Sequence, residues 1–391
     1  MAGLDALLAS KEMVLVCGSG GVGKTTISAA LGLAAAANQG AKVLVLTVDP
    51  ARRLAAALGI GGALGNTPVR VSGTERRGEL WAAMLDTKAG WDDLIRRHAP
   101  DAKVRDAVLS NPLYQNITNR FAHSHDYLAM EQLHEVHASG RYDLVIVDTP
   151  PSRNALEILD APSRMVEFFG SPLLKWLTVP YRSRLLNLAS KPFTQIADRV
   201  LGSHFLADIA EFFILFQAME RGFVTRAREV EAILGDPRTT FVVVSTLEAA
   251  PAHEAAYLAR ELVARNYQLG AVVANRVLPT AMSSKAAAAS ARRLADAVAA
   301  NGPGRSSQGT DLAVEVAGAL EADGDAVDAE LVAGVLGEIA TRFADVALVA
   351  TREAERRSEL AALAPQVLDV EALPADVHDL AGLQRIVEQL L

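Results

Sequence analysis

A glycine-rich stretch close to the start of the chain has the residue types of a phosphate-binding loop. Residues 18–25 read Gly-Ser-Gly-Gly-Val-Gly-Lys-Thr and fit the spacing G-x-x-x-x-G-K-T at each fixed position. Glycine adopts backbone conformations closed to other residues, so successive amide groups can converge on phosphate oxygens. The Lys24 ammonium then reaches the β- and γ-phosphates, and the Thr25 hydroxyl binds Mg²⁺. A chance glycine turn is the competing interpretation, but an apolar stretch before the loop and a helical one after it favour binding of ATP and Mg²⁺.

Two aspartates follow apolar stretches that are typical of buried strands. Asp148 comes directly after Leu-Val-Ile-Val at 144–147, where a carboxylate suits the metal side of an ATPase site. By itself such an aspartate is as often a helix cap or a turn residue, and the loop at 18–25 is what favours function. Asp49 follows the stretch at 43–48, and its carboxylate could orient the attacking water. Taken alone, Asp49 is better explained as a turn residue before Pro50.

Short apolar stretches alternate with helical ones along the chain. The alternation predicts an α/β fold, a P-loop NTPase with a mostly parallel sheet flanked by helices. We expect residues 1–391 to form one ATPase domain, with a helical subdomain at 90–140 and 155–235 inserted in it and a flexible loop at 301–310. The expected strands cover residues 13–17, 43–48, 80–85, 144–147, 240–245, 271–274 and 367–370.

Composition excludes several classes of function. A net charge of −8 and a pI near 5.6 argue against a nucleic-acid partner, because phosphate backbones are bound by clustered Lys and Arg. Cys17 is the only cysteine, so an intrachain disulfide, a CxxC zinc site and an iron–sulfur cluster are excluded. No apolar stretch reaches the roughly 20 residues that cross a bilayer, so we expect no transmembrane segment. Residues 1–11 lack the features of an export signal, which predicts a cytoplasmic protein.

Together these motifs resemble those of the ArsA family, which includes the arsenite-pump ATPase and the eukaryotic ATPase that targets tail-anchored membrane proteins. Residues 18–26 are similar to the family's G-K-G-G-x-G-K-T-T, residues 49–51 to its switch I motif D-P-A, and residues 148–156 to its switch II motif. Residues 241–248 and 272–276 resemble its late strands. The sequences D-P-A-R-R-L at 49–54 and D-T-P-P-S-R-N-A-L at 148–156 are most similar to those of actinobacterial members of the family. The resemblance implies a dimeric ATPase of the deviant-Walker class.

The resemblance also implies roles for individual residues. Lys24, Asp49 and Asp148 become the catalytic residues, with Thr25, Asp49 and Asp148 on the Mg²⁺ side. Asn275 becomes an adenine contact, and the loop around Leu373 and Pro374 closes over the base. The implied nucleotide-binding residues are Gly18, Ser19, Gly20, Gly21, Val22, Gly23, Lys24, Thr25, Thr26, Asn275, Arg276, Leu373 and Pro374.

The chain departs from the family pattern at three places. Ser19 stands where the family has a lysine that reaches the phosphates of the partner subunit. Either an arginine substitutes (the candidates are Arg52, Arg53 and Arg153), or a lysine-bearing paralogue forms a heterodimer with this chain, or hydrolysis is slow. Residues 153–155 read Arg-Asn-Ala where the family has G-H-T. With Cys17 alone, arsenite capture by several thiolates is excluded, and its place in an apolar strand favours an inert core thiol.

Two functions of different classes follow. In the first, a homodimer or heterodimer hydrolyses ATP and handles a hydrophobic client such as a membrane-protein segment. Its support is an aromatic region in which eight of the 11 Phe residues lie between 168 and 223, and the competing explanation is that these side chains are the subdomain's own core. The helical spacing of one group predicts a shared face for Phe205, Ile209, Phe212, Phe213 and Phe216. In the second, the chain binds nucleotide with little or no hydrolysis and regulates a lysine-bearing paralogue.

Overall fold

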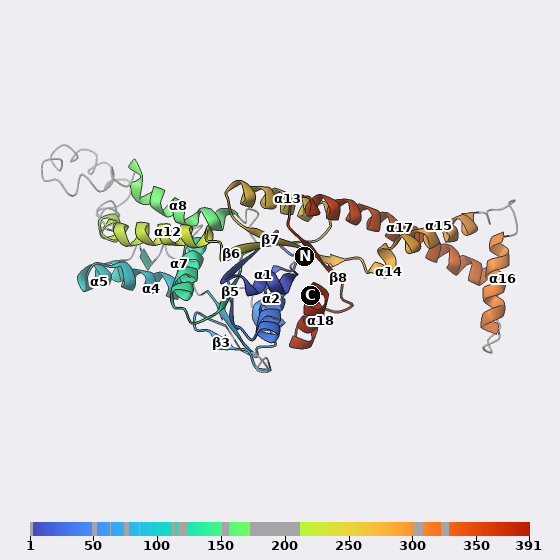
Figure 1. Ribbon diagram of the computed structural model, residues 1–391, viewed down its shortest axis with the longest axis horizontal. Coiled ribbons are helices and arrows are strands. Elements are labelled where there is room, and N and C mark those ends of the chain that lie inside the picture. Colours follow the sequence, from blue (N-terminus) through green and yellow to red (C-terminus); the bar gives the residue numbers. More distant parts are fainter. Residues whose placement is uncertain are drawn as a thin grey trace, which may run out of the picture.

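A central sheet with helices on both faces organises the molecule, and two groups of helices extend from opposite sides of the sheet (Figure 1). One group comes from the middle of the chain and the other from residues 280–361. The computed structural model describes residues 3–48, 53–62, 64–73, 78–85, 87–111, 114–115, 124–150, 156–172, 212–299, 308–321 and 328–391.

The sheet has eight strands in the order β3-β4-β2-β5-β1-β6-β7-β8, and each neighbouring pair is parallel except β3 with β4. Its central strands are buried along their whole length, as their continuous apolar sequences require of a sheet covered on both faces. The predicted α/β fold with a mostly parallel sheet is confirmed, and the short β3 was not predicted. The strands are β1 (Met13–Cys17), β2 (Lys42–Thr47), β3 (Val69–Arg70), β4 (Glu79–Met84), β5 (Leu144–Asp148), β6 (Thr239–Ser245), β7 (Leu269–Val277) and β8 (Val367–Glu371).

One face of the sheet is covered by α1 (Leu4–Ala9), α2 (Lys24–Gln39), α3 (Arg53–Ala57) and α18 (Leu380–Leu390). Helix α2 is rich in alanine and approaches the sheet closely: a Cβ at Gly32 would lie 2.6 Å from the Val45 side chain. Helix α18 buries one apolar face in the same core, made of Leu383, Ile386, Val387 and Leu390.

The other face is covered by α4 (Thr87–His98), α5 (Ala102–Ser110), α7 (Ser124–Ala138), α8 (Leu156–Gly170), α12 (Glu220–Leu234) and α13 (Ala249–Ala264). The described aromatic side chains form part of this core: Phe169 stacks on Phe216 with ring centroids 5.5 Å apart, and Phe223 is fully buried. The explanation of the aromatic region as the core of the helices therefore holds for the described residues. Phe205 and Ile209 lie outside them.

A buried carboxylate joins three helices of this layer. Glu131 on α7 accepts a hydrogen bond from Arg226 Nε of α12 over 3.1 Å and lies 3.2 Å from His98 Nε2 of α4. Arg97 lies 3.4 Å from the same oxygen. Because Glu131 is almost entirely buried, these partners replace the water that its charge would otherwise require.

A helical arm leaves the sheet after β7 and returns to it before β8. It contains α14 (Thr280–Ser283), α15 (Lys285–Ala299), α16 (Gln308–Glu321) and α17 (Ala329–Ala361), with α16 at the far end (Figure 1). The C-terminal boundary of the flexible loop predicted at 301–310 is wrong, because residues 308–310 belong to α16. Ala313 and Ala317 of this helix pack on Val332 of α17. Residues 301–307 lie outside the described residues.

Polar contacts attach the base of α17 to the sheet. The Arg357 guanidinium binds the Asp369 carboxylate of β8 at 2.8 Å, and Arg356 donates a hydrogen bond to the Leu247 carbonyl after β6. The Glu353 carboxylate accepts a hydrogen bond from the Leu278 amide after β7 over 3.0 Å. The arm is therefore connected to the carboxyl ends of β6 and β7 and to the middle of β8.

Candidate nucleotide-binding site

The loop between β1 and α2 has the conformation that phosphate binding requires. Gly20 and Gly21 form its exposed turn, and Gly18, Gly21 and Gly23 all have positive φ. A Cβ at Gly18 would lie 2.1 Å from the Val244 carbonyl oxygen, so the approach of the loop to β6 requires glycine there.

The first turn of α2 points its amide groups at this loop. Gly23, at the N-cap, has φ +94° and has no side chain with which to cap this turn. The Lys24 ammonium is buried and donates hydrogen bonds to the carbonyls of Gly18 and Ser19, at 3.0 and 2.8 Å. The positive end of the helix and a lysine thus lie together, as an anion site requires.

The parallel register places Asp148 beside the start of α2. Asp148 ends β5 and pairs with Val16 of β1 and Thr47 of β2. Its Oδ2 accepts hydrogen bonds from the Thr25 hydroxyl over 2.7 Å and from the Thr47 hydroxyl over 2.8 Å. The structure therefore brings together two residues that lie 123 positions apart in the sequence and that were both predicted on the Mg²⁺ side.

A cavity of about 280 Å³ opens in front of the loop. Three cationic side chains, Lys24, Arg53 and Arg276, border it and match the negative charge of a triphosphate. Residues of the loop, of α3 and of β7 thus line one space, which fits a nucleotide phosphate chain. The lining residues are Gly21, Gly23, Lys24, Thr25, Thr26, Arg53, Thr149 and Arg276.

Asn275 has a role that the sequence did not indicate. Its side-chain amide donates a hydrogen bond to the Val22 carbonyl over 2.8 Å, and its Oδ1 accepts one from the Arg276 amide over 3.0 Å. Arg276 itself has φ +58°. Asn275 thus holds the phosphate loop against β7, while its predicted contact with adenine stays a prediction.

The loop after β8 lies next to the end of β7, because the Ala372 amide donates a hydrogen bond to the Val277 carbonyl over 2.9 Å. Leu373 is partly buried against the core that contains α18, and Pro374 is exposed. Their closure over the base stays a prediction.

Asp49 lies outside the described residues, together with Pro50, Ala51 and Arg52. The residue before it, Val48, is buried, and its amide donates a hydrogen bond to the Asp148 carbonyl over 3.2 Å. The switch II residues 151–155, which include Arg153, also lie outside the described part.

Cys17 is fully buried in β1, and burial raises the pKa of its thiol to about 12. A fully buried thiol with a raised pKa remains protonated at neutral pH, as is typical of an inert core cysteine. Within the described ranges, no group of three or more His, Cys, Asp and Glu side chains could hold a metal ion by itself. None of the described helices is long and apolar enough to cross a bilayer.

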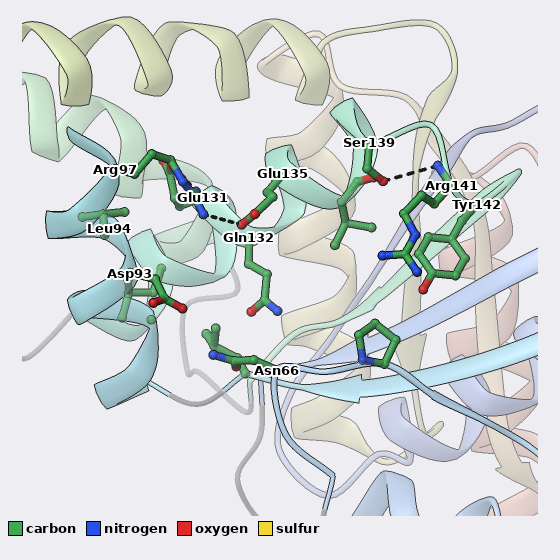
Figure 2. A pocket seen from close by; sticks show the side chains of 15 residues that line it. Asn66, Asp93, Leu94, Arg97, Glu131, Gln132, Glu135, Ser139, Arg141 and Tyr142 are labelled. Carbon is green, nitrogen blue, oxygen red and sulfur yellow. Dashed lines mark hydrogen bonds and ion pairs between the residues drawn. The ribbon is translucent and has the colours of Figure 1, made fainter.

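A second cavity of about 280 Å³ lies between α4, α7 and the segment around Asn66. Figure 2 shows the Gln132 amide pointing into it and the Arg97 guanidinium bound by Glu135. Arg97 is also close to Glu131, so acidic side chains offset its charge. This cavity lacks the net positive charge of the one at the glycine loop.

Comparison with known proteins agrees with the geometry. The family model of anion-transporting ATPases, the ArsA ATPases, matches residues 11–299. An uncharacterised protein of Streptomyces coelicolor is 29% identical over 266 residues, which cover 68% of this chain and 62% of that protein, less than two thirds of its length. An ASNA1-homologue ATPase of Entamoeba dispar is 26% identical over 286 residues, covering 71% of this chain and 80% of the relative. The GET3 ATPase of Komagataella phaffii is 26% identical over 279 residues, which cover 69% of this chain and 74% of that protein. The chain therefore belongs to the ArsA family of anion-transporting ATPases.

Proposed function

We propose that this protein hydrolyses ATP at the cavity in front of the glycine loop. The observation that carries the proposal is the hydrogen bond between Thr25 and Asp148, which joins the start of α2 to the carboxyl end of β5. A hydroxyl and a carboxylate in contact beside a phosphate-binding loop form the oxygen ligand set of a nucleotide-bound Mg²⁺.

Each residue then has a stated task. The amides of the loop and the first turn of α2 bind the β- and γ-phosphates, and Lys24 exchanges its bonds to Gly18 and Ser19 for phosphate oxygens. Thr25 and Asp148 hold Mg²⁺, which neutralises charge on the phosphates. Asp49, in the role that the resemblance to the family implies, orients the attacking water. The residue before it, Val48, is bonded to the backbone of Asp148.

Arg53 is our candidate for the charge that Ser19 lacks. It borders the cavity, whereas Arg52 and Arg153, the other two candidates, lie outside the described residues. A cation supplied to the transition state of phosphoryl transfer accelerates it by about 10³–10⁵-fold. If Arg53 supplies this charge, a homodimer of this chain needs no lysine at position 19.

The test is phosphate release by the purified chain alone. We expect Lys24→Ala to lose ATP affinity, and Asp49→Asn to bind Mg-ATP but to stop turnover. Arg53→Ala lowers kcat by about 10³-fold, whereas Arg238→Ala, at an exposed arginine paired with Glu12 and Asp236, leaves it unchanged. Turnover that survives both Asp49→Asn and Asp148→Asn would exclude hydrolysis at this site.

A second candidate is a nucleotide-binding subunit that regulates a lysine-bearing paralogue. Its support is Ser19, which carries no charge at the position where the family has a lysine. ATP binding with no turnover alone, and turnover restored on mixing with such a paralogue, distinguishes this function from the first.

Handling of a hydrophobic client stays part of the proposal, but the described aromatic side chains of α8 and residues 212–223 contribute to the core. A client surface therefore has to come from elsewhere, and the apolar residues at 173–177 are the candidates. Binding of a fluorescent apolar probe, measured with and without Mg-ATP, tests it: equal and low signals in both states reject client handling.

A further inference from the structure

The far end of the helical arm exposes apolar side chains that a helix normally buries. Leu331, Val335 and Ile339 of α17 are 64%, 51% and 48% exposed, and their spacing of four places them on one side of the helix over two turns. On α16, Val314 and Leu320 are also exposed. Single exposed apolar residues are ordinary, whereas such a stripe marks an interaction surface.

The same end of the arm is strongly acidic. Residues 308–321 and 328–341, which we call the arm tip, contain six Asp and Glu and no Lys, Arg or His. Their charge of −6 accounts for most of the net charge of the whole chain, which is −8. Of these acidic residues, Asp328 caps α17 and Glu338 pairs with Arg342.

The arm tip is separate from the ATPase site and from the matched family region. The family model ends at residue 299, the last residue of α15, so α16 and α17 lie beyond it. Between the two helices at the tip, the buried contact involves small side chains, Ala313, Ala317 and Val332, and leaves the apolar stripe outside.

We propose that the arm tip binds a basic amphipathic helix of another protein. The stripe on α17 receives its apolar face, and acidic residues of the arm tip, such as Glu315 on α16 and Glu330 on α17, attract its Lys and Arg side chains. The same charge opposes the other occupants, because a second copy of the tip and an anionic membrane surface both carry negative charge.

The test uses the full chain and a fluorescent 18-residue peptide of Leu and Lys with helical amphipathic spacing, titrated by anisotropy. Wild-type protein binds this peptide, and the matched Leu and Glu peptide does not bind. Val335→Ser with Ile339→Ser keeps the tip's charge and weakens binding at least tenfold. Glu315→Lys with Glu330→Lys keeps the stripe and also weakens binding at least tenfold.

Val263→Ser is the matched control, because Val263 is 55% exposed on α13, in the part of the chain covered by the family model. It leaves peptide binding unchanged, and circular dichroism checks that each variant keeps its helices. Failure of the wild type to bind the Leu and Lys peptide overturns the proposal, as does equal binding by the Val335 and Ile339 variant. Self-association lost with those two substitutions, or binding to vesicles of anionic lipid, assigns the surface to one of the rejected occupants.

Discussion

The Asn275 side chain donates a hydrogen bond to the Val22 carbonyl over 2.8 Å, which connects β7 to the glycine loop across 253 positions of the sequence. Both residues are buried, so neither group can exchange this bond for water. The conformation of the loop thus depends on a residue that lies on another strand.

Replacing Asn275 by Ala should destabilise the protein and weaken nucleotide binding. The loss of the bond leaves a buried carbonyl unsatisfied, which costs about 1–3 kcal/mol. Urea unfolding measures the first effect and titration with Mg-ATP the second. Asn38→Ala is the control, since Asn38 makes an exposed hydrogen bond with Asp5, and it should change neither value.

The Gly23→Ala variant should be worse than its backbone conformation alone predicts. Gly23 has φ +94°, and a Cβ there would lie 2.3 Å from Asn275 Nδ2. Gly140 also has positive φ, but a Cβ added to it meets nothing within 4 Å. We expect Gly140→Ala to cost about 1 kcal/mol of unfolding free energy and Gly23→Ala clearly more. Equal costs would show that the contact with Asn275 does not require glycine.

Glu131→Gln should destabilise the helical layer by about 3 kcal/mol, the lower limit of the cost of breaking a buried ion pair. We expect the lower limit because Arg97 and Arg226, whose charges lose their partner, are partly exposed to water. Glu135→Gln is the matched control. Glu135 also pairs with Arg97, at 2.7 Å, but its side chain is exposed, so its loss should cost less than about 1 kcal/mol. Unfolding followed by near-ultraviolet circular dichroism measures both.

Acid should weaken the same layer through Glu131. Burial raises its pKa, but the hydrogen bond from His98 and the charges of Arg226 and Arg97 lower it more, and the net pKa is below the ordinary 4.5. A carboxyl with a lowered pKa in the folded state stabilises above its unfolded value and loses that contribution as the pH falls through the folded value. As the pH falls below 4.5, we expect the unfolding free energy of the wild type to decrease faster than that of the Glu131→Gln variant. Parallel curves for the two proteins contradict the prediction.

Acid should also act at higher pH through His134. Burial, followed by the charge of Arg226, holds the pKa of His134 below the ordinary 6.5. The unfolded state therefore binds the proton more readily, and unfolding free energy declines as the pH falls below 6.5. His134→Gln should reduce this decline between pH 6.5 and 5, whereas His253→Gln, at an exposed position of α13, should not. Urea titrations at several pH values measure the slopes.

Cys17 should resist alkylation in the folded protein. Its burial, and the pKa of about 12 that results, leave almost no thiolate at pH 7.5. Mass spectrometry after treatment with iodoacetamide should show unmodified protein in buffer and one added group after unfolding in urea. Modification of the folded protein at the unfolded rate would mean that β1 is open to solvent.

The sequence predicted best the features that depend on residues close together along the chain. The continuous apolar stretches at β1, β5 and β6 predicted buried strands, and the glycine spacing predicted the loop. The two-residue β3, whose side chains are exposed, carries no such pattern. No range was predicted for α17, whose buried residues, Val332, Ala340, Ala350 and Leu360, are few and widely spaced. So sparse a set of buried positions over 33 residues gives a weak amphipathic pattern.

At the site, the spacing predicted Lys24 and Thr25, and an aspartate after an apolar strand indicated Asp148. The hydrogen bond from Asn275 to the loop was beyond prediction, because it depends on the crossing of β7 beside a loop that is distant in the sequence. Arg53 was one of three candidate arginines, and it is the one that lies among the described residues, where it borders the cavity.

Because α17 is attached to the sheet near one end, a small rotation at that end moves the other end of the helix over a larger distance. Its 33 residues extend for about 50 Å, and Glu353, Arg356 and Arg357 fix its base beside the strands that end near the loop. These residues lie about 36–42 Å from the far end of α17, so a rotation of about 5° at the base displaces that end by roughly 3–4 Å. A small angular change beside Leu278, three residues after Asn275, is therefore amplified into a displacement of several ångströms at the far end of the arm, where α16 lies.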